Sequence, residues 1–142
     1  LYMSVLATRE DIETWHNSFD ALLHPSHTEG FGLTIVESQA CGNPVVINNA
    51  HSMPELIIEG KTGEIAQVKG RRWTGALSFW EVPDPKSIWW SMEKQYKKLK
   101  ENPKQVEADC RKNVVDNFNI DTLFNERWLP LIENLQSTIL PI

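Results

Sequence analysis

The sequence predicts an α/β fold with a Rossmann-like parallel sheet and flanking helices, and three observations indicate it. First, a short apolar run at 21–24 leads into a polar turn and then into a segment with helical spacing of apolar residues. Second, Gly42 follows that segment, as the glycine that ends a helix does. Third, the continuous apolar run at 45–47 is typical of a buried parallel strand. Together they predict a strand–helix–strand unit, and such sheets bind ligands at the carboxyl ends of their strands.

Composition narrows the class of protein. The 142 residues are enough for one domain with a core. The net charge is −5, from 14 basic and 19 acidic residues without a basic stripe, so a nucleic acid is not the expected partner. Two cysteines, Cys41 and Cys110, do not form a disulfide framework, and no apolar run is long enough to span a bilayer. We expect a cytoplasmic protein; the basic cluster at 94–100 predicts a solvated helix face, with peripheral attachment to a membrane surface as the alternative.

The first residues predict a strand and then a short helix. The run 1–6 is apolar and strand-like, and a helix is expected at about 9–17. Thr8 is placed to cap it, with Asp11 completing a capping box. Ile12, Trp15 and His16 are expected to face the sheet. Because the chain starts inside an apolar run, we expect the later part of a larger domain, truncated at its N-terminus.

The turn between the first strand and the helix has the composition of an anion site. Gly30 and Gly32 lack a Cβ, so the backbone there can approach a ligand closely and adopt positive φ. The helix that begins near Gly32 offers unpaired amides and the positive end of its dipole, which suits a phosphate. Glu29 and Glu37 flank this site, and carboxylates accept hydrogen bonds from hydroxyl pairs. A ligand with hydroxyls at both ends of a phosphate group, such as a nucleotide sugar, fits this pattern.

The middle of the chain predicts a helix, a strand and an inserted segment. Ser52 is placed as an N-cap for a helix at 55–59, and a strand is expected at 64–68. The segment 69–82 predicts an inserted loop or hairpin. It holds two arginines beside tryptophans, which would stack on a base or contact an acceptor; the simpler alternative is that Trp73, Phe79 and Trp80 anchor the segment to the core.

Three helices are expected in the C-terminal part. Asp84 and Pro85 predict the start of the first, Asn102 and Pro103 that of the second, and the third starts at Asp121. Pro130 is expected to kink the third helix. The predicted buried stripe of the first consists of Ile88, Trp89, Met92, Tyr96 and Leu99, and that of the second of Val106, Cys110, Val114 and Phe118.

A combination of motifs resembles a known family. Glu29 and Glu37 enclose Gly-Phe-Gly-Leu at 30–33, and Ala-Cys-Gly-Asn-Pro-Val-Val follows at 40–46. This pattern resembles glycosyltransferase family four, whose members are retaining enzymes of the GT-B fold. The resemblance extends over about residues 1–68 and more loosely to the C-terminus. It implies that 1–142 is a partial C-terminal, nucleotide-sugar-binding domain whose partner is the N-terminal GT-B domain.

The resemblance also implies the roles of the site residues. Glu29 is implied as the catalytic-site acid, which contacts the donor sugar as an orienting group and not as a nucleophile. Glu37 is implied to hold the ribose diol. The amides that hold sugar hydroxyls and phosphate are implied to be those of Gly30, Phe31, Gly32, Leu33 and Thr34.

The implied activity is transfer of a sugar, of the hexosyltransferase type, from a nucleoside-diphosphate sugar to an acceptor hydroxyl with retention of configuration. The acceptor is a sugar, a lipid-linked glycan or a protein, and the isolated chain is expected to be inactive. The alternatives are a non-catalytic nucleotide-binding or interaction module, and a homodimer through an exposed sheet edge. No cofactor and no metal are expected: His24, His27 and Glu29 suggest a metal site by residue type only, since no helical pair fixes the histidines.

Overall fold

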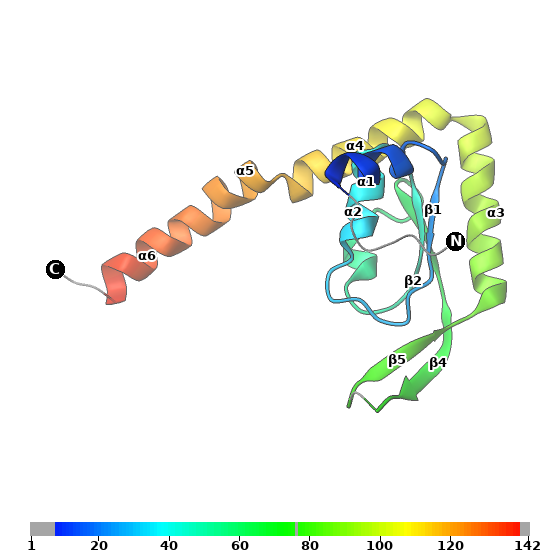
Figure 1. The fold of residues 1–142 in the computed structure, drawn as a ribbon, viewed down its shortest axis with the longest axis horizontal. Coiled ribbons are helices and arrows are strands. Elements are labelled where there is room, and N and C mark those ends of the chain that lie inside the picture. The colour runs from blue at the N-terminus through cyan, green and yellow to red at the C-terminus, as the bar shows by residue number, and fades with distance from the viewer. Residues whose placement is uncertain (1–7, 76, 140–142) are drawn as a thin grey trace.

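The computed structural model describes residues 8–75 and 77–139, which form an α/β body, a projecting hairpin and a helical arm (Figure 1). The sheet of the body has three parallel strands in the order β1 (Leu22–His24), β2 (Val45–Asn48) and β3 (Gly63–Ala66). The predicted fold class is confirmed. The strand predicted at 1–6 lies outside the described residues.

The central strand β2 is buried along its whole length because both of its faces are covered. Val45 and Ile47 belong to the apolar core together with Ile35 and Met53. Val46, between them, lines a cavity toward the long helix α3 (Pro85–Glu101). This alternation follows from the two-residue period of a strand and explains why the run 45–47 is apolar without interruption.

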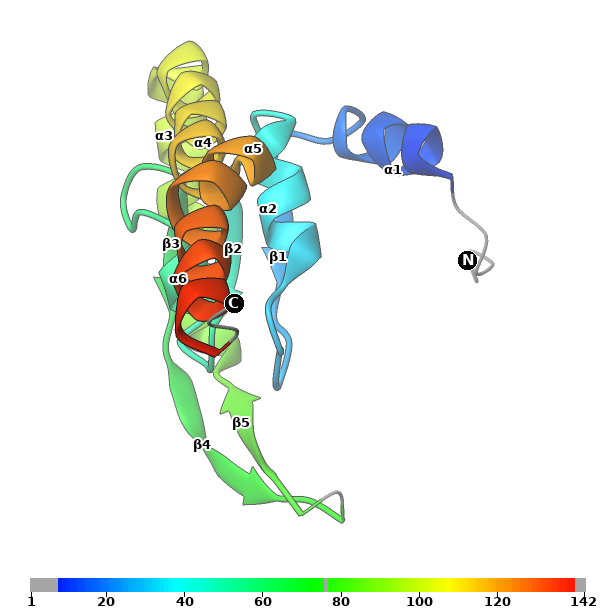
Figure 2. The same ribbon diagram turned by 90° about the vertical axis from the view of Figure 1, so that its left-hand side faces the viewer.

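The predicted caps of the first two helices are present. At α1 (Arg9–His16) the Thr8 hydroxyl accepts a hydrogen bond from the Asp11 amide at 3.2 Å, and the Asp11 carboxylate accepts one from the Thr8 amide at 2.8 Å. At the end of α2 (Leu33–Ala40) the φ of Gly42 is +90°, the value expected for a glycine after a helix. Figure 2 shows α1 beside α2 and away from α3. Of the α1 residues predicted to face the sheet, only His16 is buried. This part of α1 packs against α2 and not against the sheet.

The prediction of a helix at 55–59 is wrong. The chain forms a single 3₁₀ turn, η1 (Met53–Leu56), and then becomes extended at Ile57, which packs into the core. The Ser52 hydroxyl does not cap this turn; it donates a hydrogen bond to the Phe31 carbonyl at 3.1 Å. Burial of Ile57 therefore outweighs the local preference for a longer helix.

The segment 69–82 lies within an antiparallel hairpin of β4 (Val68–Trp73) and β5 (Phe79–Pro83) that projects from the body. The prediction that its aromatic residues anchor it to the core is wrong for two of the three. Trp73 is 55% and Phe79 49% exposed, and their rings contact each other with centroids 4.8 Å apart. That the hairpin is an insertion into the family fold stays a prediction.

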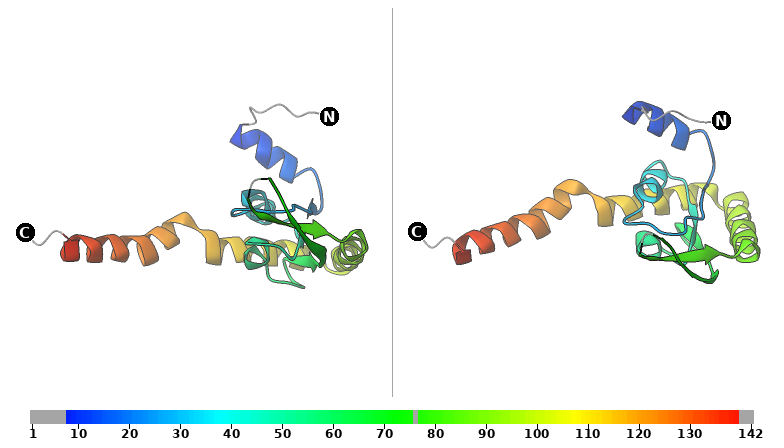
Figure 3. Two further views of the ribbon diagram at one scale, coloured as in Figure 1. Left: turned by 90° about the horizontal axis from the view of Figure 1, so that it is seen from below. Right: turned by 60° about the horizontal axis from the view of Figure 1, so that its bottom comes forward.

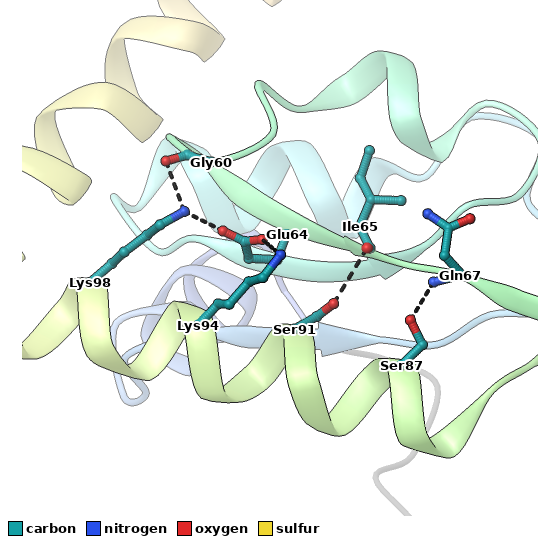
Figure 4. Close-up of polar contacts among 8 residues, drawn as sticks. All are labelled: Gly60, Glu64, Ile65, Gln67, Ser87, Ser91, Lys94 and Lys98. Atoms are coloured by element: carbon teal, nitrogen blue, oxygen red, sulfur yellow. Dashed lines mark hydrogen bonds and ion pairs between the residues drawn. The ribbon is translucent and has the colours of Figure 1, made fainter.

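Helix α3 starts as predicted but presents an unexpected face to the sheet. The Asp84 carboxylate accepts a hydrogen bond from the Lys86 amide at 3.0 Å. Most of the predicted apolar stripe is exposed, and polar side chains reach the sheet edge instead (Figure 4). Ser87 accepts a hydrogen bond from the Gln67 amide, Ser91 donates one to the Ile65 carbonyl, and Lys94 and Lys98 pair with Glu64. Glu64 is 3% exposed, so hydrogen bonds and a buried ion pair fasten this helix to β3. Met92, Tyr96 and Leu99 of the predicted stripe line the cavity that separates the helix from Val46.

The last helices form an arm that extends away from the body (Figure 3). Helix α4 (Pro103–Phe118) buries Val106 and Cys110 as predicted. After it, α5 (Ile120–Leu123), the π-helical turn η2 (Phe124–Trp128) and α6 (Leu129–Ile139) run on as one helix. The π turn ends two residues before Pro130, whose ring would clash with the carbonyl four residues back, at Glu126 inside that turn. The predicted kink therefore takes the form of a widened turn. None of the helices in the described ranges combines the length and apolar character needed to cross a membrane.

Candidate functional site

The turn between β1 and α2 is built around Gly32. Its φ is +98°, and a Cβ there would lie 3.0 Å from the Cδ1 of Ile35 and 3.1 Å from that of Leu56. Gly30, in contrast, does not adopt positive φ, and the space where its Cβ would lie is open. The expectation of positive φ is thus confirmed for Gly32 and wrong for Gly30. The close packing under Gly32 sets the direction in which α2 leaves the turn.

The start of α2 is free to receive an anion. No side chain caps it, and its first turn carries no acidic residue. The Ile35 amide is used by the Gly32 carbonyl at 3.0 Å, and the earlier amides at Leu33 and Thr34 point out of the helix end, as those of a first turn do. Leu33 is 68% exposed, so solvent and ligands reach this end.

Glu29 lies in the turn and pairs with a histidine from the preceding strand. The Glu29 Oε1 is 2.9 Å from Nε2 of His24, the last residue of β1. Both side chains are mostly buried, with 27% of Glu29 and 18% of His24 exposed. The Glu29 carboxylate is therefore held in one orientation at the carboxyl end of the sheet, with its second oxygen available to another donor.

Glu37 is also near a histidine, but on a different element. Its Oε2 is 3.9 Å from Nε2 of His16 at the end of α1, and the Glu37 side chain is 42% exposed. It lines a cavity of about 360 Å³ between α1 and α2, to which Arg9 and Ile12 also contribute. Glu29 does not line this cavity, so the two acids lie at separate positions along the turn and the helix.

The environment of His16 favours its neutral form. Burial lowers the pKa of His16, and the nearby Glu37 carboxylate only partly offsets this effect. His16 Nδ1 is buried without a hydrogen-bond partner among the described residues. A neutral imidazole beside Glu37 leaves that carboxylate free to accept hydrogen bonds from a ligand.

Other contacts brace the turn from three sides. The side-chain amide of Asn48, in β2, donates a hydrogen bond to the Ser26 carbonyl at 2.9 Å. Ser52 holds the Phe31 carbonyl, as described above, and the Phe31 ring meets Phe118 edge-on with centroids 6.2 Å apart. The site backbone is thus fixed by β2, η1 and α4 before any ligand binds, which favours tight binding by reducing the ordering cost.

The hairpin is attached to the same turn through His27. Nδ1 of His27 lies 2.7 Å from the Glu81 carbonyl, so Nδ1 carries the proton and donates. The Glu81 amide in turn donates to the His27 carbonyl at 3.0 Å, and the His27 ring packs on Trp80 at 5.7 Å. These contacts fasten β5 to the turn two residues before Glu29.

The sequence alone does not reveal that each of the two acids has a histidine beside it. His24 and Glu29 are five residues apart, and His16 and Glu37 are farther still, so no helix or strand period links them. Only the direction of the turn and the placement of α1 bring them together. Within the described ranges, no group of three or more His, Cys, Asp or Glu residues has the geometry to hold a metal ion.

Comparison with known proteins places the chain in a family. The family model described as glycosyl transferases group 1 matches residues 4–74 of the 142. The chain belongs to this family. The resemblance predicted from the glutamate pair and the glycine turn is therefore confirmed.

Curated relatives of this group 1 chain are much longer than it is. It is 42% identical over 53 residues to a D-inositol 3-phosphate glycosyltransferase of Paenarthrobacter aurescens, covering 37% of this chain and 13% of the relative. It is 54% identical over 44 residues to an uncharacterized 41.2 kDa protein in the cps region of Klebsiella pneumoniae, covering 31% and 12%. The chain thus spans about an eighth of the length of these relatives.

Solved structures share its fold. Anabaena HepE in complex with UDP has a TM-score of 0.65 and 22% identity, covering 91% of this chain and 30% of that one. The C-terminal domain of a glycosyl transferase group 1 family protein, LpcC, from Francisella tularensis has a TM-score of 0.57 and 21% identity, covering 83% and 53%. The architecture of this chain is therefore that of the C-terminal domain of a GT-B glycosyltransferase.

Proposed function

We propose that this chain is the donor-binding part of a retaining glycosyltransferase that transfers a sugar from a nucleoside-diphosphate sugar to an acceptor hydroxyl. The observation that carries the proposal is the uncapped start of α2 after Gly32, with Glu29 fixed by His24 on one side and Glu37 exposed in a cavity on the other. An anion site between two hydroxyl acceptors matches the order of groups in such a donor, which is sugar, diphosphate and ribose.

Each group has a defined role in this proposal. Glu29 accepts hydrogen bonds from hydroxyls of the donor sugar and orients it. The amides of Gly30, Phe31, Gly32, Leu33 and Thr34 hold sugar hydroxyls and the diphosphate. Glu37 accepts the two ribose hydroxyls, and the cavity between α1 and α2 leaves room for the nucleoside beyond them. The crystal structures of Anabaena HepE, which share this fold, are complexes with UDP, with UDP and glucose, or with UDP-glucose, and this supports a nucleotide sugar as the ligand.

The chemistry follows from the position of the helix. When the bond between the anomeric carbon and the diphosphate oxygen breaks, its electron pair leaves with the diphosphate, which gains negative charge. The acceptor oxygen bonds to the same carbon and passes its proton to the departing diphosphate oxygen. The amides and dipole at the start of α2 stabilise the charge on the leaving group without a cofactor. Glu29 keeps the sugar oriented so that the acceptor reaches the face required for retention.

The remaining parts of the cleft are proposed to come from an N-terminal GT-B domain. The helical arm is suited to contact it, because its exposed side chains are large and apolar; they include Phe124, Trp128, Leu131, Ile132 and Leu135. In this proposal the isolated chain has no transferase activity.

Titration of the intact protein with UDP and with GDP by calorimetry tests donor binding. We expect Glu37→Ala to weaken binding by about 10- to 100-fold, the effect of losing hydrogen bonds to a charged group. Glu10→Ala, an acid on the exposed side of α1, is the matched control and leaves binding unchanged. Glu29→Ala is expected to lower the rate of sugar transfer more than nucleotide affinity. If neither Glu37→Ala nor Glu29→Ala changes nucleotide affinity or the transfer rate, or if the protein binds no nucleotide at all, a non-catalytic module is favoured instead.

A further inference from the structure

The hairpin formed by β4 and β5 has an apolar end that the fold does not use. Trp73 and Phe79 close the ladder and are 55% and 49% exposed, and Leu77 beyond them is 80% exposed. Figures 1 and 2 show the hairpin extending from the body on the side opposite to α4. These three residues, called the hairpin tip below, bury little surface inside the chain and so contribute little to its core.

Leu77 is also held in a conformation that disfavours its side chain. Its φ is +54°, in the left-handed region where glycine and asparagine are usual. The turn is closed by hydrogen bonds that do not need a leucine, from the Thr74 amide to the Ser78 carbonyl and from the Leu77 amide to the Thr74 carbonyl. A strained and exposed leucine at a turn that asparagine suits better points to a use outside the fold.

The strand β4, which leads into the apolar tip, is basic. Residues 69–80 carry Lys69, Arg71 and Arg72 and no acid, although the whole chain has a net charge of −5. Arg71 lies over the Phe79 ring at 5.6 Å and also pairs with the buried Glu81, and Arg72 lies over the Trp80 ring at 5.9 Å. No ion pair is recorded for Lys69 or Arg72 within the described parts of the chain, so these two charges are available to an anionic partner.

We propose that the hairpin tip inserts into the headgroup region of a lipid bilayer that contains anionic lipids. Trp73, Leu77 and Phe79 enter the apolar boundary, while Lys69 and Arg72 stay at the level of the phosphates. Large aromatic and aliphatic side chains beside lysine and arginine are the composition of membrane-surface elements. An apolar tip without basic residues, or a basic strand without apolar residues, would offer only one of the two kinds of group that a membrane-surface element combines.

The geometry favours a lipid surface over a glycan. A sugar stacks on a flat aromatic face, but the Trp73 and Phe79 rings meet edge to face at 69° and do not form a common platform. Leu77, the most exposed of the three, offers neither a ring nor a hydrogen bond to a sugar. A bilayer boundary needs neither, and it rewards buried apolar area in any orientation.

Membrane attachment would also place the candidate site. Because His27 joins β5 to the turn that carries Glu29, a hairpin in the bilayer holds that turn at the membrane surface. The attachment itself does not depend on the proposed transferase activity, so the two proposals are tested separately.

Co-sedimentation of the intact protein with vesicles tests the attachment. We expect binding to phosphatidylcholine vesicles that contain phosphatidylglycerol, weaker binding at high salt, and none to phosphatidylcholine alone. The double variant Lys69→Gln/Arg72→Gln is expected to bind about 25-fold more weakly, from about fivefold for each charge near an anionic surface. Trp73→Ser and Leu77→Asn should each weaken binding at least as much as one charge, and Leu77→Asn should fold at least as stably as the parent because asparagine tolerates its φ.

The matched control is Trp90→Ser on α3, a tryptophan that is 60% exposed and lies outside the hairpin. It should bind vesicles as the parent does. The proposal is overturned if the intact protein sediments equally with and without phosphatidylglycerol, if the tip variants keep full binding, or if Trp90→Ser loses as much affinity as Trp73→Ser.

Discussion

Replacement of Gly63 by alanine should separate two strands of the sheet. A Cβ at Gly63 would lie 2.3 Å from the Val45 carbonyl oxygen, 3.0 Å from Val45 Cγ2 and 3.2 Å from Ile57 Cδ1. The first neighbour is backbone of the central strand β2, which has no rotamer by which to move away. To restore an ordinary contact, β3 must shift from β2 by about 1 Å, and such a shift breaks part of the ladder.

The size of the effect follows from these contacts. Overpacking of a closely packed site costs about 1–3 kcal/mol. Loss of one or two ladder hydrogen bonds, among them that of the Val45 amide to the Thr62 carbonyl at 3.2 Å, adds about 1 kcal/mol each. We therefore expect Gly63→Ala to lower the free energy of unfolding by about 2–5 kcal/mol, a large part of the ~5–15 kcal/mol of an ordinary domain.

Urea unfolding followed by circular dichroism measures this loss. With a slope of about 2 kcal/mol per molar urea, the midpoint should fall by about 1–2.5 M. Gly70→Ala is the control, because a Cβ at Gly70 in β4 has no neighbour within 4 Å; it should change the midpoint little. Equal midpoints for the two variants would refute the argument that Gly63 is required by its closeness to β2.

Three further predictions concern single side chains. Burial raises the pKa of Cys110 to about 12, so a thiol reagent should modify Cys41 in the folded protein and Cys110 only after unfolding; rapid reaction at both would contradict this. Burial lowers the pKa of His16, so the folded protein binds fewer protons there than the unfolded chain, and the free energy of unfolding should fall as the pH decreases from about 7 to 5. Urea unfolding at the two pH values should show a smaller fall for His16→Gln than for the parent. An equal fall in both proteins would count against the lowered pKa of His16. Lys98→Met leaves the buried Glu64 carboxylate with Lys94 alone at 3.6 Å and should lower the free energy of unfolding by about 2 kcal/mol. The double variant Lys98→Met/Glu64→Gln should recover part of this loss. Additive losses in the double-mutant cycle would argue against coupling between Lys98 and Glu64.

The turn that forms the candidate site could be predicted from the sequence only in part. The glycine turn, the helix after it and the two acids are all visible because they lie within one short stretch. Their partners His24 and His16 were not predicted, and neither was the link from His27 to the hairpin. These contacts depend on how distant elements are placed, and a single sequence carries no signal for that placement.

Helix α3 shows why a hydrophobic stripe can mislead. The predicted stripe included Trp89, Met92 and Tyr96, which are 56%, 44% and 57% exposed. Ser91 and Gln95 are buried in their place. The edge strand β3 offers the Ile65 carbonyl to Ser91 and the Glu64 carboxylate to Lys94 and Lys98, which satisfies these polar side chains where the helix meets it. The buried Gln95 side chain has no hydrogen-bond partner among the described residues, so pairing with β3 does not account for its burial.

The sequence by itself determined the local features of this protein: the capping box of Thr8 and Asp11, the helix start at Asp84 and the left-handed glycine at Gly42. Each of these depends on hydrogen bonds or φ values within four residues, so the chain nearby is enough to specify it. Only the tertiary structure decided which face of α3 is buried, how the glutamates are held, and that the hairpin aromatics are exposed. Those outcomes depend on the competition among distant surfaces for burial, which becomes defined only when the strands and helices have been packed together.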